Sequence, residues 1–257
     1  MEISFEISKG IAWIKLNRPE VYNAFNRSMA LQMQAALDEA SQHEAVRVVV
    51  ITGNGKAFSA GQDLGEAVAP DGPGLERILS EHYNPIIKKI SALEKPVIAL
   101  VNGVAAGAGA NIALACDIVL AHEQASFIQA FSKIGLIPDS GGTYLLPRLI
   151  GSQKALALMM TGDKVSAAEA ERMNMIFKAV PTDSYETFTT DFVTQIASMP
   201  TKALALTKKA VQLSWFQSLD EQLDTELTLQ VEAGKTEDFS EGVSAFLEKR
   251  KPNFSGK

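Results

Sequence analysis

Two short runs of small residues could bring backbone N–H groups together at a reactive site. Ala60-Gly61-Gln62-Asp63-Leu64 is a turn after a strand, and Gly107-Ala108-Gly109 is a second turn at the start of a helix. If the strands that lead into these turns are neighbours, two N–H groups can converge on one carbonyl oxygen and form an oxyanion hole. Removing one such donor typically raises the barrier by about 3–4 kcal/mol. The alternative for the second run is a tight turn that permits close packing.

The second run is well placed to face negative charge. It follows an apolar segment, residues 96–101, whose length and β-branched content are typical of a buried strand. It leads into residues 111–115, which can form a helix. The start of a helix presents unbonded N–H groups and the positive end of the helix dipole, and both suit a developing negative charge.

An acid, Asp139, lies in a third turn. Residues 136–143 predict a turn into a helix that ends before Pro147 or Gly151. An aspartate that precedes Ser-Gly-Gly-Thr at a helix start is a good N-cap, and this structural role is the first interpretation of Asp139.

Other familiar chemical motifs fail at specific positions. Gly107 and Gly109 could open the dinucleotide fingerprint G-x-G-x-x-G, but Ile112 stands where the third glycine is needed. Ala57 stands where a phosphate-binding P-loop that ends at Gly55-Lys56 needs Ser or Thr. The three histidines are scattered without metal-ligand spacing, so no metal is expected.

The composition narrows the class of protein. The 257 residues, 46% hydrophobic and 21% charged, suffice for one large domain or a domain with an appendage. The single cysteine, Cys116, excludes an intramolecular disulfide and fits a reducing compartment. A net charge of −6 does not favour nucleic acid, and no apolar run reaches the roughly 18 residues of a membrane span. Met1–Ser4 lack the regions of a signal peptide, so we expect a cytoplasmic protein with no membrane or nucleic-acid partner.

Strand–turn–helix units fill residues 1–195. A helix is expected to begin near Asn26 or Ser28, both good caps, and Ser166 is expected to cap another. A loop is expected at residues 65–74 because it holds several Gly and Pro. The expected strands cover residues 3–7, 11–16, 46–52, 96–101, 118–121 and 176–180, with an extended piece at 125–131. The first two are expected to form a hairpin around Lys9-Gly10. Further helices are expected at residues 155–161, 167–173 and 75–93, the last because Ile78, His82, Ile86 and Ile90 recur at four-residue spacing.

From about residue 196 the pattern predicts helices only. Residues 202–213 form the first, and Ser240 is expected to cap another over residues 241–249. Between them, Leu219, Leu223, Leu227 and Val231 form an apolar stripe. The stripe indicates a core or interface face, and the sequence does not decide whether this region packs on its own body or on a neighbouring subunit.

Five runs, in order along nearly the whole chain, resemble the enoyl-CoA hydratase/isomerase (crotonase) family. The resemblance implies an α/β fold with a ββα spiral catalytic body over residues 1–195 and a helical trimerisation region over residues 196–257. It also implies acyl-CoA thioester substrates, no cofactor beyond the coenzyme A of the substrate, and a homotrimer or dimer of trimers. The runs are Phe58–Leu64, Lys95–Ala99, Asn102–Gly109, Cys116–Ile118 and Gly135–Thr143.

The resemblance also assigns roles to individual residues. It implies that the oxyanion hole is made by the N–H groups of Gln62 and Ala108, and that Ala24, Phe254 and Lys257 help to hold coenzyme A. The side chains of Tyr83 and Phe131 are expected to shape the acyl pocket. The remaining candidates for substrate contact are Ala60, Gly61, Asp63, Leu64, Gly107 and Asn111.

The reaction depends on which acids are present. Hydratases of the family use two glutamates, and those positions hold Asn111 and Phe131, neither of which can move a proton as a carboxylate does. Isomerases of the family place an acid at the position of Asp139. Residues 130–139 and 145–148 resemble the ring-1,2-epoxyphenylacetyl-CoA isomerases, which convert a ring epoxide to an oxepin and whose relatives shift double bonds. The resemblance thus implies an acyl-CoA isomerase in which Asp139 relays a proton.

Three alternatives stay open. One is an enoyl-CoA hydratase, or a Δ3,Δ2-enoyl-CoA isomerase of aliphatic chains that uses the same acid with a different pocket. Another is an aryl-CoA enzyme in which Asp139 is a nucleophile, which would leave a covalent adduct. The last is a protein with the same fold that binds acyl-CoA as a scaffold without chemistry.

Overall fold

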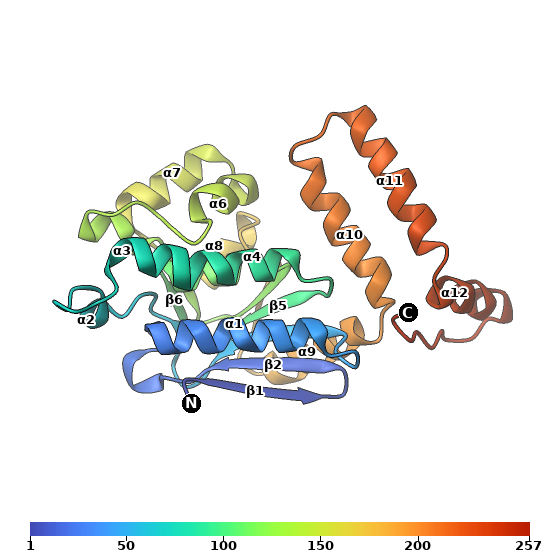
Figure 1. Cartoon of the computed structure of the whole chain (residues 1–257), viewed down its shortest axis with the longest axis horizontal. Helices are drawn as coiled ribbons and strands as arrows, with labels where there is room; N and C mark the ends of the chain where they lie inside the picture. Colours follow the sequence, from blue (N-terminus) through green and yellow to red (C-terminus); the bar gives the residue numbers. More distant parts are fainter.

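A computed structural model describes all residues, 1–257, and its body is built on two sheets (Figure 1). The larger sheet contains β1 (Ile3–Ser8), β2 (Ile11–Leu16), β3 (Val48–Gly53), β5 (Val97–Val101), β7 (Ile118–His122) and β10 (Lys178–Val180). Its strand order is β1-β2-β3-β5-β7-β10. β1 and β2 form the antiparallel hairpin expected around Lys9-Gly10, and the other neighbours are parallel.

A second, smaller sheet contains three-residue strands, of which the sequence pattern predicted only β8, within the extended piece at residues 125–131. They are β4 (Ala57–Ser59), β6 (Val104–Ala106), β8 (Ser126–Ile128) and β9 (Lys164–Ser166), in the order β4-β6-β8-β9. β4, β6 and β8 each follow a strand of the larger sheet directly, and each is followed by a helix. The chain therefore repeats a strand–strand–helix unit, and the expected α/β spiral of ββα units is confirmed.

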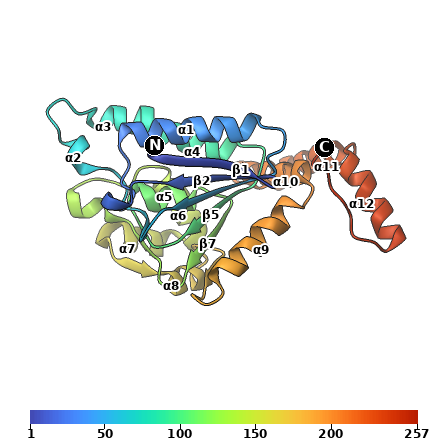
Figure 2. The ribbon, with the colours of Figure 1, turned by 90° about the horizontal axis from the view of Figure 1, so that it is seen from below.

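Helices cover both faces of the larger sheet. α1 packs on β1 and β2 from one side, and α9 packs on β2 and β3 from the other (Figure 2). The α-helices of the body are α1 (Arg27–Gln42), α2 (Leu64–Ala67), α3 (Gly74–Arg77), α4 (Asn84–Ala92), α5 (Ala108–Leu114), α6 (Gly142–Ile150), α7 (Ser152–Thr161), α8 (Ala167–Arg172) and α9 (Tyr185–Ala197). Two 3₁₀ turns, η1 (Pro19–Val21) and η3 (Ala130–Ile134), and one π-helical turn, η2 (Ile78–Tyr83), complete it.

Capping chemistry explains where several helices begin. Asn26 caps α1 by accepting the N–H of Met29 at 2.8 Å, and Ser166 caps α8 by accepting the N–H of Glu169 at 3.2 Å. Both caps were expected. Residues 65–74 were expected to be a loop but include α2, because Asp63 accepts the N–H of Gly65 and starts one helical turn.

The expected helix over residues 75–93 is three segments, α3, η2 and α4 in succession. Pro85 has no N–H, so the carbonyl of Glu81 lacks its usual helical partner. The side chain of Gln34 donates to that carbonyl at 2.7 Å instead. The wide turn η2 ends two residues before this proline and buries His82 and Tyr83. Turns of this type occur frequently at functional sites.

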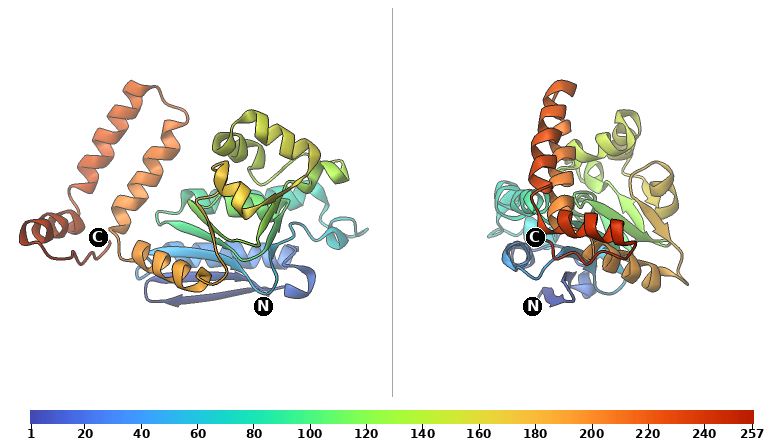
Figure 3. Two further views of the ribbon diagram at one scale, coloured as in Figure 1. Left: turned by 180° about the vertical axis from the view of Figure 1, so that it is seen from behind. Right: turned by 90° about the vertical axis from the view of Figure 1, so that its right-hand side faces the viewer.

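The chain ends in three helices that extend away from the body (orange to red in Figure 3). They are α10 (Thr201–Ser214), α11 (Leu219–Ala233) and α12 (Glu237–Glu248). Thr236 caps α12, so the expectation that Ser240 starts this helix was wrong; Ser240 lies one turn inside it. The division into residues 1–195 and 196–257 stays a prediction. Every helix in the structure is too short or too polar to cross a membrane.

Candidate active site

The two turns of small residues lie side by side. β4 and β6 pair in parallel, with Ser59 opposite Ala105, so both strands deliver their turns to the same edge of the small sheet. A Cβ atom added at Gly61 would lie 2.8 Å from the carbonyl oxygen of Ala106 and 3.3 Å from the amide nitrogen of Ala108. Gly61 also has a φ of +89°, which side chains disfavour. Only glycine permits this close approach of the two turns.

The amide of Gln62 is directed by its neighbours. The N–H of Phe25 donates to the carbonyl of Gly61 at 2.7 Å, and the N–H of Asp63 donates to the carbonyl of Phe25 at 2.8 Å. Because successive peptide groups of an extended segment point in opposite directions, the N–H of Gln62 points away from Phe25. It donates to no protein acceptor.

The amide of Ala108 is also unbonded. Ala108 is the first residue of α5, and no side chain caps this helix. The preceding residue, Gly107, has a φ of +53° and donates its own N–H to the carbonyl of Ile128 at 2.9 Å. The arrangement leaves two free amides, of Gln62 and Ala108, on adjacent turns, which is the donor set that an oxyanion hole needs.

Asp139 lies in the third turn, between η3 and α6, and its carboxylate does not cap α6. Gly141 occupies the N-cap position and no side chain fills that role, so the capping interpretation of Asp139 was wrong. Its Oδ1 accepts a hydrogen bond from the hydroxyl of Ser140 at 2.8 Å, and no cation pairs with it. Burial raises the pKa of the Asp139 carboxyl, and the Ser140 hydroxyl opposes part of that rise. A carboxylate with these properties can serve as a base closer to neutral pH.

Asn111 holds the main chain of this acid. Its Nδ2 donates to the carbonyl of Asp139 at 2.8 Å, and its Oδ1 accepts from Nε2 of Gln129 at 2.8 Å. Asn111 is fully buried and Gln129 nearly so. Asn111, on the middle of α5, thus connects the helix that carries Ala108 to the turn that carries Asp139.

Two expected pocket residues also reach this region. A Cβ added at Gly107 would lie 3.8 Å from the ring tip of Phe131, so this ring lies beside the second turn. The hydroxyl of Tyr83 donates to Oε1 of Gln62 at 2.9 Å. Burial first, and then the nearby carboxylate of Asp139, raise the pKa of Tyr83 well above its ordinary value. Tyr83 therefore lies within electrostatic reach of both Gln62 and Asp139.

Other expected contacts have structural roles. Asp63 pairs with Arg18 at 3.0 Å as well as capping α2. Arg18 also donates to the carbonyl of Ala24, which is buried. Ala60 and Leu64 are exposed beside the Gln62 turn. Their part in substrate binding stays a prediction.

Phe254 and Lys257 do not join the site of their own chain. The carbonyl of Phe254 accepts from Arg47 at 3.1 Å, and the ammonium of Lys257 lies 3.8 Å from Glu44. The C-terminus lies beside α10 and α12, on the opposite side of the molecule from α2 (Figure 1). Within one protomer these two residues are remote from Gln62 and Asp139.

The structure adds residues that the sequence did not single out. Glu66 of α2 lies 3.4 Å from Nε2 of Gln62, and both its carboxylate oxygens accept the N–H of Arg27 at 3.0 Å. Gln129 and Ser140 support Asn111 and Asp139. The contacts of Glu66 with Arg27 and of Gln129 with Asn111 join segments far apart in the chain, so no local pattern indicates them. No group of three or more His, Cys, Asp or Glu is placed to hold a metal ion.

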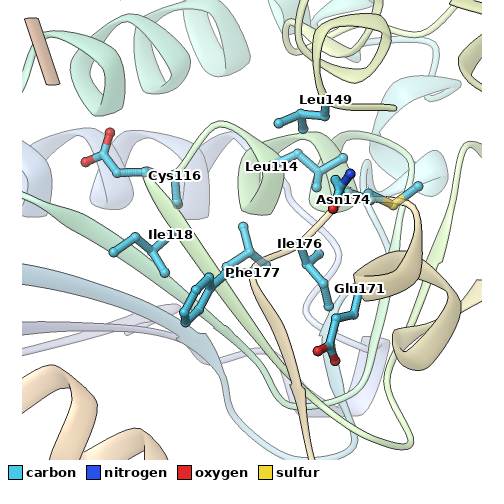
Figure 4. Close-up of a pocket in the computed structure, with 11 residues that line it drawn as sticks. Leu114, Cys116, Ile118, Leu149, Glu171, Asn174, Ile176 and Phe177 are labelled. Atoms are coloured by element: carbon cyan, nitrogen blue, oxygen red, sulfur yellow. The ribbon is translucent and has the colours of Figure 1, made fainter. Parts of the chain in front are cut away.

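Two grooves lie near the C-terminal end of α5, away from the Ala108 amide. One, of about 480 Å³, is bordered by Leu114, Cys116, Ile176 and Phe177 (Figure 4). The other, of about 500 Å³, is largely apolar and lies between α10 and the body, and it reaches Gly141 and Leu145 beside the Asp139 turn. Cys116 is buried at this junction, and burial raises the pKa of its thiol, so it is inert as a nucleophile.

Comparison with known proteins identifies the family of this chain. The family model for enoyl-CoA hydratase/isomerase matches residues 6–257. A Rhodobacter capsulatus protein named "Probable enoyl-CoA hydratase" is 47% identical, over 99% of this chain and 98% of its own length. The 1,2-epoxyphenylacetyl-CoA isomerase of Escherichia coli is 43% identical, over 98% of this chain and 97% of its own. The crystal structure of an enoyl-CoA hydratase from Bacillus anthracis superposes with a TM-score of 0.93 at 33% identity, covering 100% of both chains. The chain therefore belongs to the enoyl-CoA hydratase/isomerase family and has its crotonase fold.

Proposed function

We propose that this protein is an acyl-CoA isomerase that converts ring-1,2-epoxyphenylacetyl-CoA to the oxepin, shifts a double bond of an acyl-CoA, or does both. The thioester oxygen lies between the amides of Gln62 and Ala108, and Asp139 moves the proton. The observation that carries the proposal is the state of Asp139, a half-buried carboxylate with a raised pKa and no cation partner. The 43% identity to an isomerase with that substrate supports the choice of acyl group.

The side chains in the two glutamate positions support isomerisation over hydration. The side chain of Asn111 is hydrogen-bonded to the Asp139 carbonyl and to Gln129, and Phe131 has no ionisable group. Neither can activate a water molecule or protonate a carbon. Enoyl-CoA hydratase activity remains the second candidate because relatives carry that name.

One carboxylate suffices for the double-bond shift. The base removes a proton from carbon, negative charge develops on the thioester oxygen between the two amides, and the same proton returns to another carbon. Conversion of the epoxide to the oxepin is likewise an isomerisation, in which bonds of the ring rearrange and no atom is added. In both reactions the oxyanion hole polarises the same carbonyl.

The placement of the chain end supports an oligomer. Phe254 and Lys257 cannot reach the site of their own protomer, so their expected contact with coenzyme A requires a neighbouring copy. We therefore include a homotrimer, or a dimer of trimers, in the proposal. No cofactor beyond the coenzyme A of the substrate is included.

The deciding experiment measures turnover of crotonyl-CoA, a 3-enoyl-CoA and epoxidised phenylacetyl-CoA. Isomerisation of the second or third is expected, and hydration of crotonyl-CoA is expected to be slow. Asp139→Asn should lower kcat by about 10²–10⁴-fold, with acyl-CoA affinity nearly unchanged. Asp163→Asn, at an exposed aspartate, is the matched control and should retain full activity.

Each competing function has its own signature. Rapid hydration of crotonyl-CoA that Asp139→Asn leaves intact would contradict the proposal and favour a hydratase. A covalent substrate adduct on Asp139, detected by mass spectrometry, would indicate a nucleophile instead of a proton relay. Tight acyl-CoA binding with no turnover of any thioester would favour a scaffold.

A further inference from the structure

We infer that Tyr83 is a positioning residue for the oxyanion hole, because its hydroxyl fixes the Gln62 side chain and thereby aims the Gln62 amide. The inference rests on the proposed function, in which that amide binds the thioester oxygen. It differs from the expectation that Tyr83 contacts the acyl group. Tyr83 has no exposed surface in the structure, and its hydroxyl faces Gln62.

Every polar atom of the Gln62 side chain has a partner within the protein. Oε1 accepts from the Tyr83 hydroxyl at 2.9 Å, and Nε2 lies 3.2 Å from the carbonyl of Asp63 and 3.4 Å from Oε2 of Glu66. The side chain thus has no free group to offer a substrate. Its contacts prevent rotation of the residue whose main-chain amide is the proposed donor.

Glu66, which contacts the Gln62 side chain, is itself held in place. Glu66 accepts the N–H of Arg27, the first residue of α1, through both carboxylate oxygens at 3.0 Å. The hydrogen bonds therefore join α1, α2, the Gln62 turn and η2. α1 and η2 are far from the Gln62 turn in sequence, and Gln62 is connected to both through these side chains.

Phe25 holds the same residue from the opposite side. Its peptide group bonds to Gly61 and Asp63, which flank Gln62. Its ring packs against Tyr83, with ring centroids 5.9 Å apart. The main chain of Gln62 is thus fixed by Phe25 and its side chain by Tyr83, and the two fixing residues contact each other.

The π-helical turn explains how Tyr83 comes to this position. Pro85 ends the regular hydrogen bonding, and the side chain of Gln34 bonds to the carbonyls of Glu81 and His82, which fixes the turn against α1. Burial keeps the pKa of Tyr83 well above its ordinary value. The phenol therefore remains protonated, and remains a donor, at neutral pH.

The test uses Tyr83→Phe and a spectroscopic reporter of carbonyl polarisation. Cinnamoyl-CoA is a suitable probe because a conjugated thioester absorbs at longer wavelength when its carbonyl is polarised. The unmodified protein should shift the absorption of bound cinnamoyl-CoA to the red, and Tyr83→Phe should reduce that shift. The loss of one buried hydrogen bond predicts about a tenfold fall in kcat with KM within about twofold.

Tyr185→Phe is the matched control. The hydroxyl of Tyr185 is buried and has no hydrogen-bond partner, so its removal should leave kcat, KM and the red shift unchanged. Gln62→Leu keeps the main-chain amide and removes the side-chain contacts, so it should reproduce the effects of Tyr83→Phe. If Tyr83 acts through Gln62, the double variant should be no worse than either single one.

Three results would overturn the inference. The first is a full kcat and an unchanged red shift in Tyr83→Phe. The second is an additive loss in the double variant, which would mean that Tyr83 acts independently of Gln62. The third is the absence of any red shift in the unmodified protein, which would remove the oxyanion hole itself and the proposed function with it. Should Tyr83→Phe fail to fold, Gln62→Leu removes the same contact, and a full kcat with an unchanged red shift in that variant would overturn the inference.

Discussion

The side chain of Asn111 donates a hydrogen bond to the main-chain carbonyl of Asp139 at 2.8 Å. Asn111 stands where the family resemblance expects a hydratase glutamate, and in this chain it positions the acid of another segment. Its second contact, with Gln129, fixes which amide atom faces Asp139. A position that carries catalysis in hydratases thus appears here as support for a different carboxylate.

Asn111→Ala should therefore impair turnover without removing any reacting group. Without the hydrogen bond from Asn111, the turn that carries Asp139 can move, and we expect kcat to fall by about 10–100-fold. The buried Gln129 amide loses its acceptor, which should cost about 1–3 kcal/mol of unfolding free energy. Ser126→Ala is the control, because the buried Ser126 hydroxyl has no partner to lose. Denaturant unfolding and steady-state kinetics measure both effects, and full activity in Asn111→Ala would contradict the positioning role.

The pH dependence of kcat/KM should report the Asp139 carboxyl. Burial raises its pKa, so the acidic limb should lie above the ordinary range for an aspartate. The Ser140 hydroxyl lowers that pKa, so removing it should move the limb to still higher pH. Ser140→Gly is the variant to use because Ser140 has a φ of +50°, which glycine accepts without strain. A limb that does not move would show that another group controls activity.

The raised pKa of Asp139 also predicts how stability depends on this residue. Because the folded-state pKa of Asp139 is raised, its ionisation disfavours the folded state, and its contribution to stability falls as pH rises through that pKa. Asp139→Asn should therefore have the same Tm as the unmodified protein at neutral pH, or a higher one. Thermal unfolding at neutral pH checks this, and a clearly lower Tm would indicate that the carboxylate has a structural role.

The sequence predicted elements that have a strong local signal. The β1–β2 hairpin, the cap at Asn26 and the buried strands follow from alternation, capping chemistry and apolar runs. β4 and β6 did not, because three residues are too few to show a period. The four-residue spacing of Ile78, His82, Ile86 and Ile90 predicted a helix. The same spacing is also what a wider π-helical turn such as η2 would produce. A repeat of four drifts around a regular helix of 3.6 residues per turn, and the wider π turn keeps all four side chains buried.

The geometry of the candidate site was predictable where it depends on main-chain turns and not where it depends on distant side chains. Two small-residue turns after strands indicate an oxyanion hole, and family resemblance selects the amides. The contact of Gln62 with Tyr83 joins residues 21 positions apart, so it leaves no local pattern in the sequence. Phe254 was expected at the site, but it contacts α12 and Arg47, and these contacts hold it far from Gln62 and Asp139.

Gly109→Ala should damage the oxyanion hole through packing alone. A Cβ at this position would lie 2.6 Å from Cβ and 2.7 Å from the carbonyl oxygen of Ser59, so α5 must move away from β4. Overpacking of this kind costs about 1–3 kcal/mol, and the separation of the two amides should lower kcat. Gly234→Ala is the control, because its new Cβ would lie no closer than 3.4 Å to any atom. Equal stability and activity of the two variants would contradict the close approach of α5 and β4.

The apolar stripe of α11 should hold copies of the chain together. Leu219, Leu223, Leu227 and Val231 are 73%, 52%, 64% and 51% exposed, and the last three border a groove of about 770 Å³ between α10 and α11. Large apolar faces of this kind are rarely left in water. Leu223→Glu combined with Leu227→Glu should convert a trimer or hexamer to monomers, measured by sedimentation velocity. Thr228→Glu, at an exposed polar position of the same helix, should leave the assembly intact.

Because Phe254 and Lys257 are remote from the site of their own chain, the monomer should also bind acyl-CoA more weakly. A monomeric unmodified protein with full acyl-CoA affinity would contradict both the assembly and the shared site.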